Sequence, residues 1–292
     1  MNDLVSVVII TYKRPLEVLS RAIESVIKQS YHNIELFVVN DAPEEIKLAN
    51  QLRDYINNLT DTRVQYIQHE VNKGANAARN TGLRHARGKY ICFLDDDDEW
   101  ISNKIELQLQ YMKPGVGLVY SPFYVRGNNV EKISNINLPD DPLKAILEGN
   151  YIGSTSFPML LTSAVKEAGG FDETLASCQE YDLWIRITSK YAICKTDKPV
   201  GYYYLSNDST FKKPDKYVKG IDAVIAKHSD LYNKYPRQLS NRYMHMAFAM
   251  LKKKELKRYA SYKRKAVKAD RSNPNNILLL YLINKIKARR QK

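Results

Sequence analysis

Four short apolar runs, each followed by a polar or helical segment, occupy the first third of the chain and limit the folds it can adopt. The runs are residues 4–12, 34–41, 64–69 and 89–94, and the first reads LVSVVIITY. A continuous β-branched run is expected of a strand buried on both faces. Between the runs, as in residues 16–27, apolar positions recur at helical spacing. This alternation predicts an α/β fold with a mostly parallel central sheet flanked by helices.

The pattern changes beyond residue 100. Residues 116–125 predict a strand, 128–142 a variable loop and 163–168 a short helix. From about residue 215 the pattern is almost wholly helical. We therefore expect an α/β domain over residues 1–215 and a helical C-terminal extension over residues 216–292.

The C-terminal region carries the positive charge of the chain. The formal net charge is +13, and residues 237–292 hold 17 Lys and Arg against two acids. A solvated helical face, contact with anionic lipid headgroups and nucleic-acid binding all remain open. Residues 252–271 mix cations with Leu, Tyr, Ala and Val, and the apolar stretch after them is too short to span a bilayer, which favours peripheral contact with an anionic membrane. The acidic segment 95–98 argues against nucleic acid as the main partner.

Several classes of protein are disfavoured by composition. No stretch approaches the roughly 18 consecutive apolar residues of a membrane span. The N-terminus has neither the basic region nor the cleavage site of a signal peptide. Three cysteines without CxxC spacing argue against a disulfide framework or a zinc site. We therefore expect a protein of the reducing cytosol.

Four consecutive aspartates, Asp95 to Asp98, follow the fourth apolar run in the sequence FLDDDDEW. Because neighbouring carboxylates repel each other, the quartet is either a solvated acidic turn or a site for a cation. Ligands of parallel sheets bind beyond the carboxyl ends of the strands, where Thr11, Tyr12 and Asp41 also lie. Mg²⁺ is generally held by one or two carboxylates plus substrate phosphates. The position of the quartet therefore favours a Mg²⁺ or Mn²⁺ site.

Six segments, in this order and spacing, resemble the family 2 glycosyltransferases, which have the GT-A fold. They are SVVIITYKRP, FVVND, NKGANAARNTGL, GKYICFLDDDDEW, GGFDE and QEYDLWIRI, between residues 4 and about 210. The resemblance implies an inverting enzyme that moves a sugar from a nucleotide-diphosphate donor, expected to be a UDP-sugar, to a hydroxyl of a glycan or lipid-linked glycan. It also implies Mg²⁺ or Mn²⁺, bacterial surface-polysaccharide synthesis, and a peripheral place at the cytoplasmic face of the plasma membrane.

The same resemblance implies roles for individual residues. Asp97 and Asp95 match the metal-binding DxD motif, and Asp41 matches the aspartate that hydrogen-bonds the base. Glu180 stands where many members carry the catalytic aspartate. The donor nucleotide is expected to contact Thr11, Tyr12, Arg14, Asp41, Lys73, Gly74, Arg79, Asp95 and Asp96, with Asp96 nearer the ribose. The chain departs from the family pattern at Asn40 and at Ala42-Pro43, where an acid and Gly-Ser are usual.

Inverting transfer needs a base to take the proton of the acceptor hydroxyl. Glu180 and Asp182 point about 200° apart on a helix, so only one of them can face the site. The other is expected to pair locally, for instance with Arg186 at i+4. We favour Glu180 as the base and keep Asp182 as the alternative.

Other readings stay open beside this one. A sugar nucleotidyltransferase would carry a glycine-rich loop after the first strand, and TYKRPLEV has no glycine there. A non-catalytic membrane or nucleic-acid binding module would have lost the carboxylate of the base. Because Glu180 stands where an aspartate is usual, this alternative stays open. The tyrosine-rich residues 201–209 either line the acceptor side or form an alternating strand. Trp100 and Trp184 are expected in the core or a pocket wall.

Overall fold

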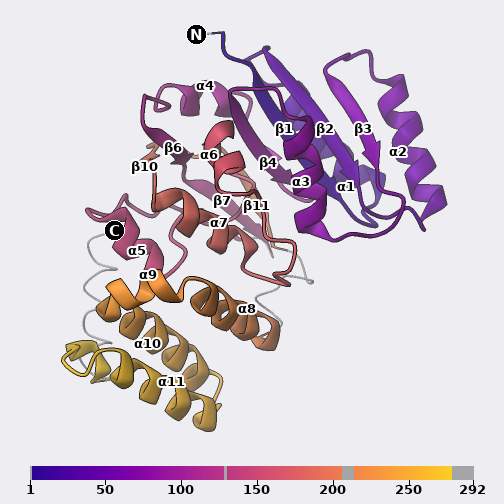
Figure 1. Cartoon of the computed structure of the whole chain (residues 1–292). Helices are drawn as coiled ribbons and strands as arrows, with labels where there is room; N and C mark the ends of the chain where they lie inside the picture. Colours follow the sequence, from indigo (N-terminus) through magenta and orange to yellow (C-terminus); the bar gives the residue numbers. More distant parts are fainter. Residues whose placement is uncertain (1, 128–129, 206–213, 278–292) are drawn as a thin grey trace.

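The computed structural model describes residues 2–127, 130–205 and 214–277. In its first third, strands and helices alternate along the chain (Figure 1). The elements there are β1 (Val5–Thr11), α1 (Leu16–Ile27), β2 (Ile34–Asn40), α2 (Ile46–Asn58), β3 (Val64–Gln68), α3 (Ala75–His85) and β4 (Tyr90–Asp95). Each strand coincides with a predicted apolar run to within a residue, so the expected alternation is confirmed.

A seven-stranded central sheet forms the middle of the molecule, in the order β10-β6-β9-β4-β1-β2-β3. Its further strands are β6 (Val116–Tyr120), β9 (Met159–Leu161) and β10 (Ala192–Lys195). The β1 pairs with β2 and β4 are parallel, whereas β9 runs antiparallel to both β4 and β6. The sheet is therefore mostly parallel, as predicted.

Helices cover both faces of this sheet, so alternate residues of β1 enter different cores. Val7 and Ile9 pack in one hydrophobic cluster with Leu19 of α1. Val8 packs on the opposite face, in the cluster that contains Ala78 of α3. Burial on both faces explains why the strands read as continuous apolar runs.

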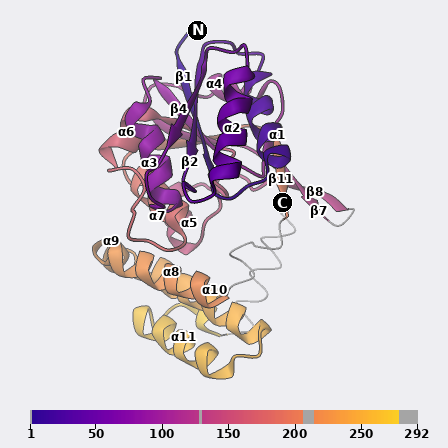
Figure 2. The same cartoon turned by 90° about the vertical axis from the view of Figure 1, so that its right-hand side faces the viewer.

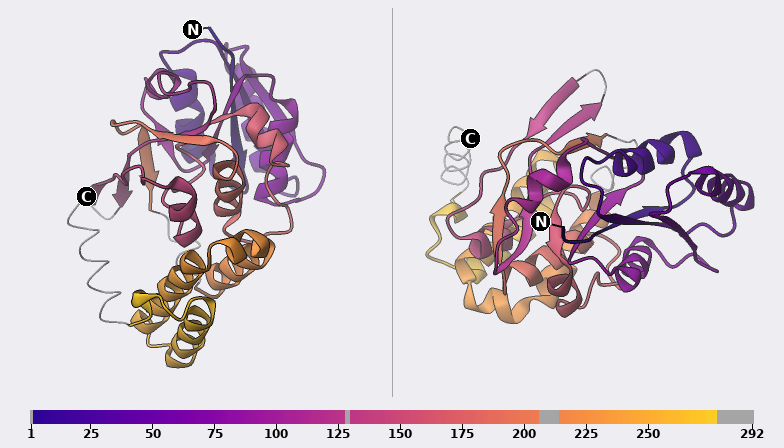
Figure 3. Two further views of the ribbon diagram at one scale, coloured as in Figure 1. Left: turned by 60° about the vertical axis from the view of Figure 1, so that its left-hand side comes forward. Right: turned by 90° about the horizontal axis from the view of Figure 1, so that it is seen from above.

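A second, four-stranded sheet has the order β5-β11-β7-β8. Its strands are β5 (Glu99–Trp100), β11 (Gly201–Tyr204), β7 (Phe123–Gly127) and β8 (Val130–Ser134). The hairpin of β7 and β8 projects from the body of the molecule (Figures 2 and 3). The tyrosine-rich residues begin as a strand, β11, and residues 206–209 of that segment lie outside the described part.

Two sequence predictions for this region were wrong. The single strand expected over residues 116–125 is two strands, because Ser121-Pro122 separates β6 of the central sheet from β7 of the second sheet. Proline donates no backbone hydrogen bond to a sheet, and it restricts the residue before it. The loop expected over residues 128–142 contains β8, which gains its backbone partners only by pairing antiparallel with β7.

The remaining helices are short until the C-terminal region. They are α4 (Lys104–Leu109), α5 (Pro142–Glu148), α6 (Thr162–Glu167), α7 (Gln179–Thr188), α8 (Pro214–Lys227), α9 (Ser229–Lys234), α10 (Pro236–Lys252) and α11 (Leu256–Ala269), followed by the 3-10 turn η2 (Pro274–Asn276). The described residues after 213 are thus almost wholly helical, as predicted. Within the described ranges, every helix is too short or too polar to cross a bilayer.

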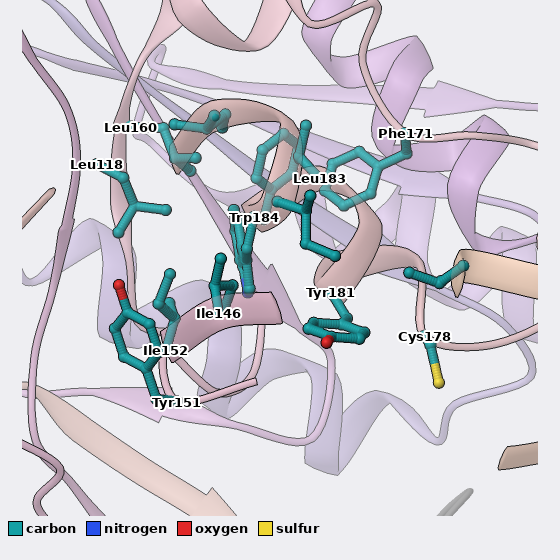
Figure 4. Packing of buried hydrophobic residues seen from close by; sticks show 14 of the residues in the cluster. Leu118, Ile146, Tyr151, Ile152, Leu160, Phe171, Cys178, Tyr181, Leu183 and Trp184 are labelled. Carbon is teal, nitrogen blue, oxygen red and sulfur yellow. The ribbon is translucent and has the colours of Figure 1, made fainter. Parts of the chain in front are cut away.

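The C-terminal helices share a core with the α/β part. Ile221 of α8 and Met246 of α10 belong to the same buried cluster as Tyr181 and Trp184 of α7. Figure 4 shows the α7 side of this cluster, where Tyr181, Leu183 and Trp184 project among side chains from the central sheet and α5. The predicted boundary between residues 215 and 216 falls inside α8, and hydrophobic packing continues across it.

Candidate active site

The aspartate quartet forms a tight turn between β4 and β5. The Asp98 backbone N–H donates to the Asp95 carbonyl oxygen at 3.1 Å. The Asp98 carboxylate is fully buried and accepts from the Ser156 hydroxyl at 2.5 Å and from the Tyr204 backbone N–H at 3.2 Å. Burial and the charges of Asp95 and Asp97 raise the pKa of Asp98 well above its usual value. Asp98 therefore holds the turn in place.

Asp96 joins the turn to the end of β1. Its carboxylate is 7% exposed and accepts from the Thr11 hydroxyl and from the Arg14 Nε–H, both at 2.8 Å. Burial raises the pKa of Asp96 to about 6, although Arg14 and Thr11 act in the opposite direction. The structure thus brings Thr11, Arg14 and Asp96 together, as predicted. Their contact with a nucleotide stays a prediction.

Asp95 and Asp97 carry the partly exposed carboxylates of the turn, with side chains 30% and 24% exposed. Asp95 accepts from Arg79 Nη2 at 2.6 Å, and Asp97 accepts from Arg14 Nη2 at 3.1 Å. The Asp97 carbonyl oxygen also accepts from Arg21 Nη2 at 2.8 Å. Burial, followed by the charge of Asp95, raises the pKa of Asp97. The negative charge of this pair is therefore only partly compensated.

The donor set of the turn suits a metal that shares its ligands with a substrate. The described residues contain no group of three or more His, Cys, Asp or Glu side chains that would hold a metal ion alone. Asp95 and Asp97 offer two carboxylates, the hard ligands that Mg²⁺ and Mn²⁺ accept together with phosphate oxygens. The residues present therefore fit a site in which a metal binds two carboxylates and a diphosphate. Among the described residues, protein side chains alone do not complete the coordination of a metal ion.

Asp41, at the end of β2, holds the loop that leads into α3. Its carboxylate is buried and accepts from the backbone N–H groups of Lys73 at 2.8 Å and Gly74 at 2.7 Å. Gly74 has a φ of 87°, a conformation that favours glycine. The structure therefore brings the predicted residues Asp41, Lys73 and Gly74 together. Because the Asp41 carboxylate accepts hydrogen bonds from the backbone of the other two, it fixes the conformation of this loop.

His69 completes this loop and was missed in the sequence. Its Nδ1 lies 2.7 Å from Asp41 Oδ1, and its Nε2 lies 2.8 Å from the Thr81 hydroxyl. The available signal was that Asp41 and His69 follow β2 and β3, which proved to be neighbouring parallel strands. Without the pairing of those strands, the histidine had no recognisable partner.

Glu180 lies in the first turn of α7 and is half-buried. Burial raises the pKa of its carboxyl, the charge of Asp95 acts in the same direction, and the charge of Arg79 opposes them. Arg79 is 6% exposed, and its Nε and Nη1 are buried without a hydrogen-bond partner in the described residues. The pKa of Glu180 is thus raised, and the positive charge of Arg79 acts on both Glu180 and Asp95.

Asp182 faces the C-terminal helices. It is fully buried, and its oxygens contact Arg186 Nη2 at 2.6 Å, Lys227 Nζ at 3.1 Å and His228 Nε2 at 2.8 Å. Burial acts to raise its pKa, but the His228, Arg186 and Lys227 contacts outweigh it, so the pKa lies below the usual value. The expected pairing with Arg186 is confirmed. Because Arg186 and Lys227 occupy Oδ2 of Asp182 and His228 occupies Oδ1, the geometry favours Glu180 over Asp182 as the base.

Three further residues considered in the sequence are the two tryptophans and Tyr12. Trp100 and Trp184 are buried, and their indole N–H groups donate to the Ser156 and Gly153 carbonyl oxygens, so both belong to the core, as expected. Tyr12 is 49% exposed beside Thr11. A small pocket next to Arg14 is lined by Thr11, Lys13, Arg14, Leu16, Leu19, Asn40, Ala42, Leu48 and Leu52.

The central sheet with the aspartate turn at its edge is the architecture of the GT-A glycosyltransferases. Residues 6–164 match the family model "Glycosyl transferase family 2". The chain therefore belongs to glycosyl transferase family 2. This confirms the resemblance drawn from the six sequence segments.

Curated relatives agree with this family. The chain is 33% identical over 196 residues to a putative colanic acid biosynthesis glycosyl transferase, WcaA, of Escherichia coli K12, covering 65% of this chain and 68% of the relative. It is 37% identical over 131 residues to the E. coli UDP-Glc:alpha-D-GlcNAc-diphosphoundecaprenol beta-1,3-glucosyltransferase WfgD, covering 44% and 49%. An uncharacterized glycosyltransferase of Rickettsia bellii is 32% identical over 227 residues, and the aligned part is 31% of its length.

Solved structures show the same fold at low identity. S. aureus TarS in complex with UDP-GlcNAc matches with a TM-score of 0.66 and 16% identity, over 91% of this chain and 81% of that one. The mannosyltransferase PcManGT from Pyrobaculum calidifontis, in complex with GDP-Man and Mn²⁺, matches with a TM-score of 0.65 and 16% identity, over 97% and 79%. These matches establish the fold.

We expect Asp182→Asn to destabilise the protein by about 3–5 kcal/mol at pH 7, because it removes the counter-charge of Arg186 and one of the two carboxylates that Lys227 contacts. The pKa of Asp182 is depressed on folding, so its contribution is present above the unfolded value of about 4 and is lost as the pH falls below it. Urea unfolding curves of both proteins, measured at pH 7 and in steps toward acid, test this.

The control is Asp215→Asn, which removes an exposed partner of Arg258. Exposed ion pairs contribute only about 0–1 kcal/mol, so this variant should unfold close to the wild type. Equal unfolding midpoints for Asp182→Asn and Asp215→Asn would contradict a structural role of Asp182.

Proposed function

We propose that this protein is an inverting glycosyltransferase that transfers a sugar from a nucleotide-diphosphate donor to a hydroxyl of a glycan acceptor. The observation that carries the proposal is the Glu180 carboxyl, whose pKa is raised and which shares the charge of Arg79 with the partly exposed Asp95, while Arg14 contacts the neighbouring Asp97. Such a set offers a proton acceptor and an electrostatic partner for a departing diphosphate. Membership of glycosyl transferase family 2 supports the same reaction.

The donor is expected at the carboxyl edge of the central sheet. Thr11 and Arg14, which contact Asp96 at this edge, are candidate contacts of the nucleotide. Arg79 has two N–H groups without a partner in the described residues, so it can donate to an anionic substrate. The relative WfgD is named for UDP-Glc, and TarS binds UDP-GlcNAc, which favours a UDP-sugar as donor here.

Asp97, together with Asp95, would hold Mg²⁺ or Mn²⁺. The metal, when bound, offsets the charge that develops on the departing diphosphate. Arg14 orients this end of the site, because its guanidinium contacts both Asp96 and Asp97. Arg21 fixes the turn from the other side by its contact with the Asp97 carbonyl oxygen.

Glu180 would accept the proton of the acceptor hydroxyl as that oxygen attacks the anomeric carbon. A general base works best when its pKa lies near the operating pH. Burial moves the pKa of Glu180 upward from the ordinary carboxyl range, in the direction that makes it a better base. Attack opposite the leaving diphosphate inverts the configuration of the sugar.

Glu180→Gln should lower sugar transfer by about 10²–10⁴-fold while donor binding is retained, since the amide cannot accept the proton. The measurement is transfer or hydrolysis across a panel of nucleotide sugars, with calorimetric binding of the same donor. Glu167→Gln, on the exposed side of α6, is the matched control and should keep full activity. Full activity of Glu180→Gln would move the role of base to another residue.

Asp97→Ala should abolish metal-dependent binding of the nucleotide-sugar and thereby its turnover. The expected wild-type result is binding that requires Mg²⁺ or Mn²⁺ and is lost on chelation with EDTA. Binding that is equally tight in EDTA would contradict the metal. Failure of the wild type to bind any nucleotide with metal present would contradict the proposed function itself.

We also propose that the protein contacts an anionic membrane through the outer face of α10 and α11, where a lipid-linked acceptor would lie at the cytoplasmic surface. Tyr262 and Ala266 of α11 are buried, whereas Leu256 is 64% exposed among cations. Exposed cations along α11 and in the connection before it include Lys253, Lys254, Lys257, Arg264 and Lys268. Residues 278–292, an apolar run with a cationic end that is part of the predicted anchor, lie outside the described residues.

Lys257→Glu, Arg264→Glu and Lys268→Glu combined should weaken binding to phosphatidylglycerol-containing vesicles by about 100-fold or more, at about 1 kcal/mol for each lost cation. The measurement is vesicle sedimentation, with phosphatidylcholine vesicles for comparison. A control with the same charge change replaces Lys47, Lys113 and Lys190, which are exposed on other parts of the molecule. Equal losses in both triple variants would contradict a specific membrane face.

A further inference from the structure

A groove on the outer side of the second sheet lies between α1 and the strands β5 and β11. It has a volume of about 510 Å³, which is within the range of roughly 300–1,000 Å³ typical of small-molecule sites. The ribbons of α1 and β11 lie close together in Figure 2, and residues of both line the groove. The side chains that define its chemistry come from three places. Helix α1 provides Arg21, Glu24 and Lys28, β5 and the residues after it provide Glu99 and Ser102, and β11 provides Tyr202.

The second sheet presents a tyrosine face on this side. Tyr202 pairs in register with Tyr124, and Tyr204 pairs with Arg126, so all four side chains share one face. The Tyr124 and Tyr202 rings are stacked, with centroids 5.1 Å apart and an interplanar angle of 21°. The Arg126 guanidinium lies 3.8 Å from the Tyr202 ring centre. Phe123, at an alternate position, packs inward, so the tyrosine face is a separate aromatic surface.

The charges of the groove are balanced. Arg21 and Lys28 supply two cations, and Glu24 and Glu99 supply two acids, with Lys28 paired to Glu24 at 2.7 Å. Such a balance does not favour a phosphate or another strong anion as ligand. Carboxylates accept hydrogen bonds and a guanidinium donates them, so the set suits hydroxyl groups. Aromatic rings beside these groups offer an apolar surface to the C–H face of a sugar ring.

Arg21 connects the groove to the aspartate turn. Its Nη2 donates to the Asp97 carbonyl oxygen at 2.8 Å, and its guanidinium lies 3.9 Å from the Tyr204 ring centre. Its Nε is buried and has no hydrogen-bond partner among the described residues, and Glu99 Oε2 lies 3.7 Å from it. The Arg21 side chain is 35% exposed, so its guanidinium reaches the groove and can donate to a ligand hydroxyl there. The groove is thus adjacent to the aspartate turn.

We propose that this groove binds a neutral saccharide and serves as a subsite for acceptor sugars remote from the reacting hydroxyl. Tyr202 supplies the stacking surface, Glu99 accepts sugar hydroxyls and Arg21 donates to them. The assignment to the acceptor rests on the proposed function, whereas saccharide binding in the groove rests on the groove alone.

The test uses the full chain and a panel of immobilised neutral oligosaccharides, without a nucleotide-sugar donor. The wild type should bind at least one of them, and Tyr202→Ala and Glu99→Gln should each weaken that binding by tenfold or more. UDP with Mn²⁺ should not displace the saccharide, because none of the residues that line the groove is a predicted contact of the donor nucleotide. The control is Tyr259→Ala, a partly buried tyrosine of α11, which should bind as the wild type does.

Three outcomes would overturn the proposal: no bound neutral oligosaccharide, equal binding by wild type and Tyr202→Ala, or displacement of the saccharide by UDP. Calorimetric binding of UDP with Mn²⁺ is measured on every variant to show that each one is folded. If the wild type does not bind UDP, the proposed function is contradicted. Saccharide binding in the groove is then judged from the oligosaccharide measurements by themselves.

Discussion

The buried carboxylate of Asp98 is the constraint around which the site is organised. A carboxylate without partners in the protein interior is very costly, so the chain must supply donors to it. One donor is the Ser156 hydroxyl, and the other is the backbone N–H of Tyr204 in the second sheet. The two sheets are therefore tied together at this turn. The partly exposed carboxylates of Asp95 and Asp97 take their positions from it.

The helix that carries Glu180 depends in a similar way on residues far along the chain. Asp182 is held by Lys227 and His228, and Tyr181 contacts Tyr232 through their hydroxyl groups. Gly220 of α8 allows close approach to the turn before α7, because a Cβ there would lie 2.2 Å from the Ser177 hydroxyl oxygen. The C-terminal helices thus help to position α7 and, with it, the candidate base Glu180. This role is separate from any contact they make with a membrane.

Three surfaces of different charge surround this framework. The carboxyl edge of the central sheet combines acids with Arg14 and Arg79, a mixture suited to a metal and a diphosphate. The groove beside α1 is balanced in charge and aromatic, which suits a neutral sugar. The outer face of α11 is cationic, which suits anionic lipid. Donor, glycan and membrane would each meet a surface of matching chemistry.

The sequence by itself determined the alternation of strands and helices, the position of the aspartates after β4 and the helical C-terminal region, because apolar periodicity and element ends are local properties. It also placed Glu180 and Asp182 on opposite sides of one helix and predicted the Arg186 pair. Only the tertiary structure decided the second sheet, the Asp41–His69 pair and the burial of Asp182 by α8. These contacts join residues 28 to 106 positions apart, and a local pattern carries no record of which distant backbone or cation completes them.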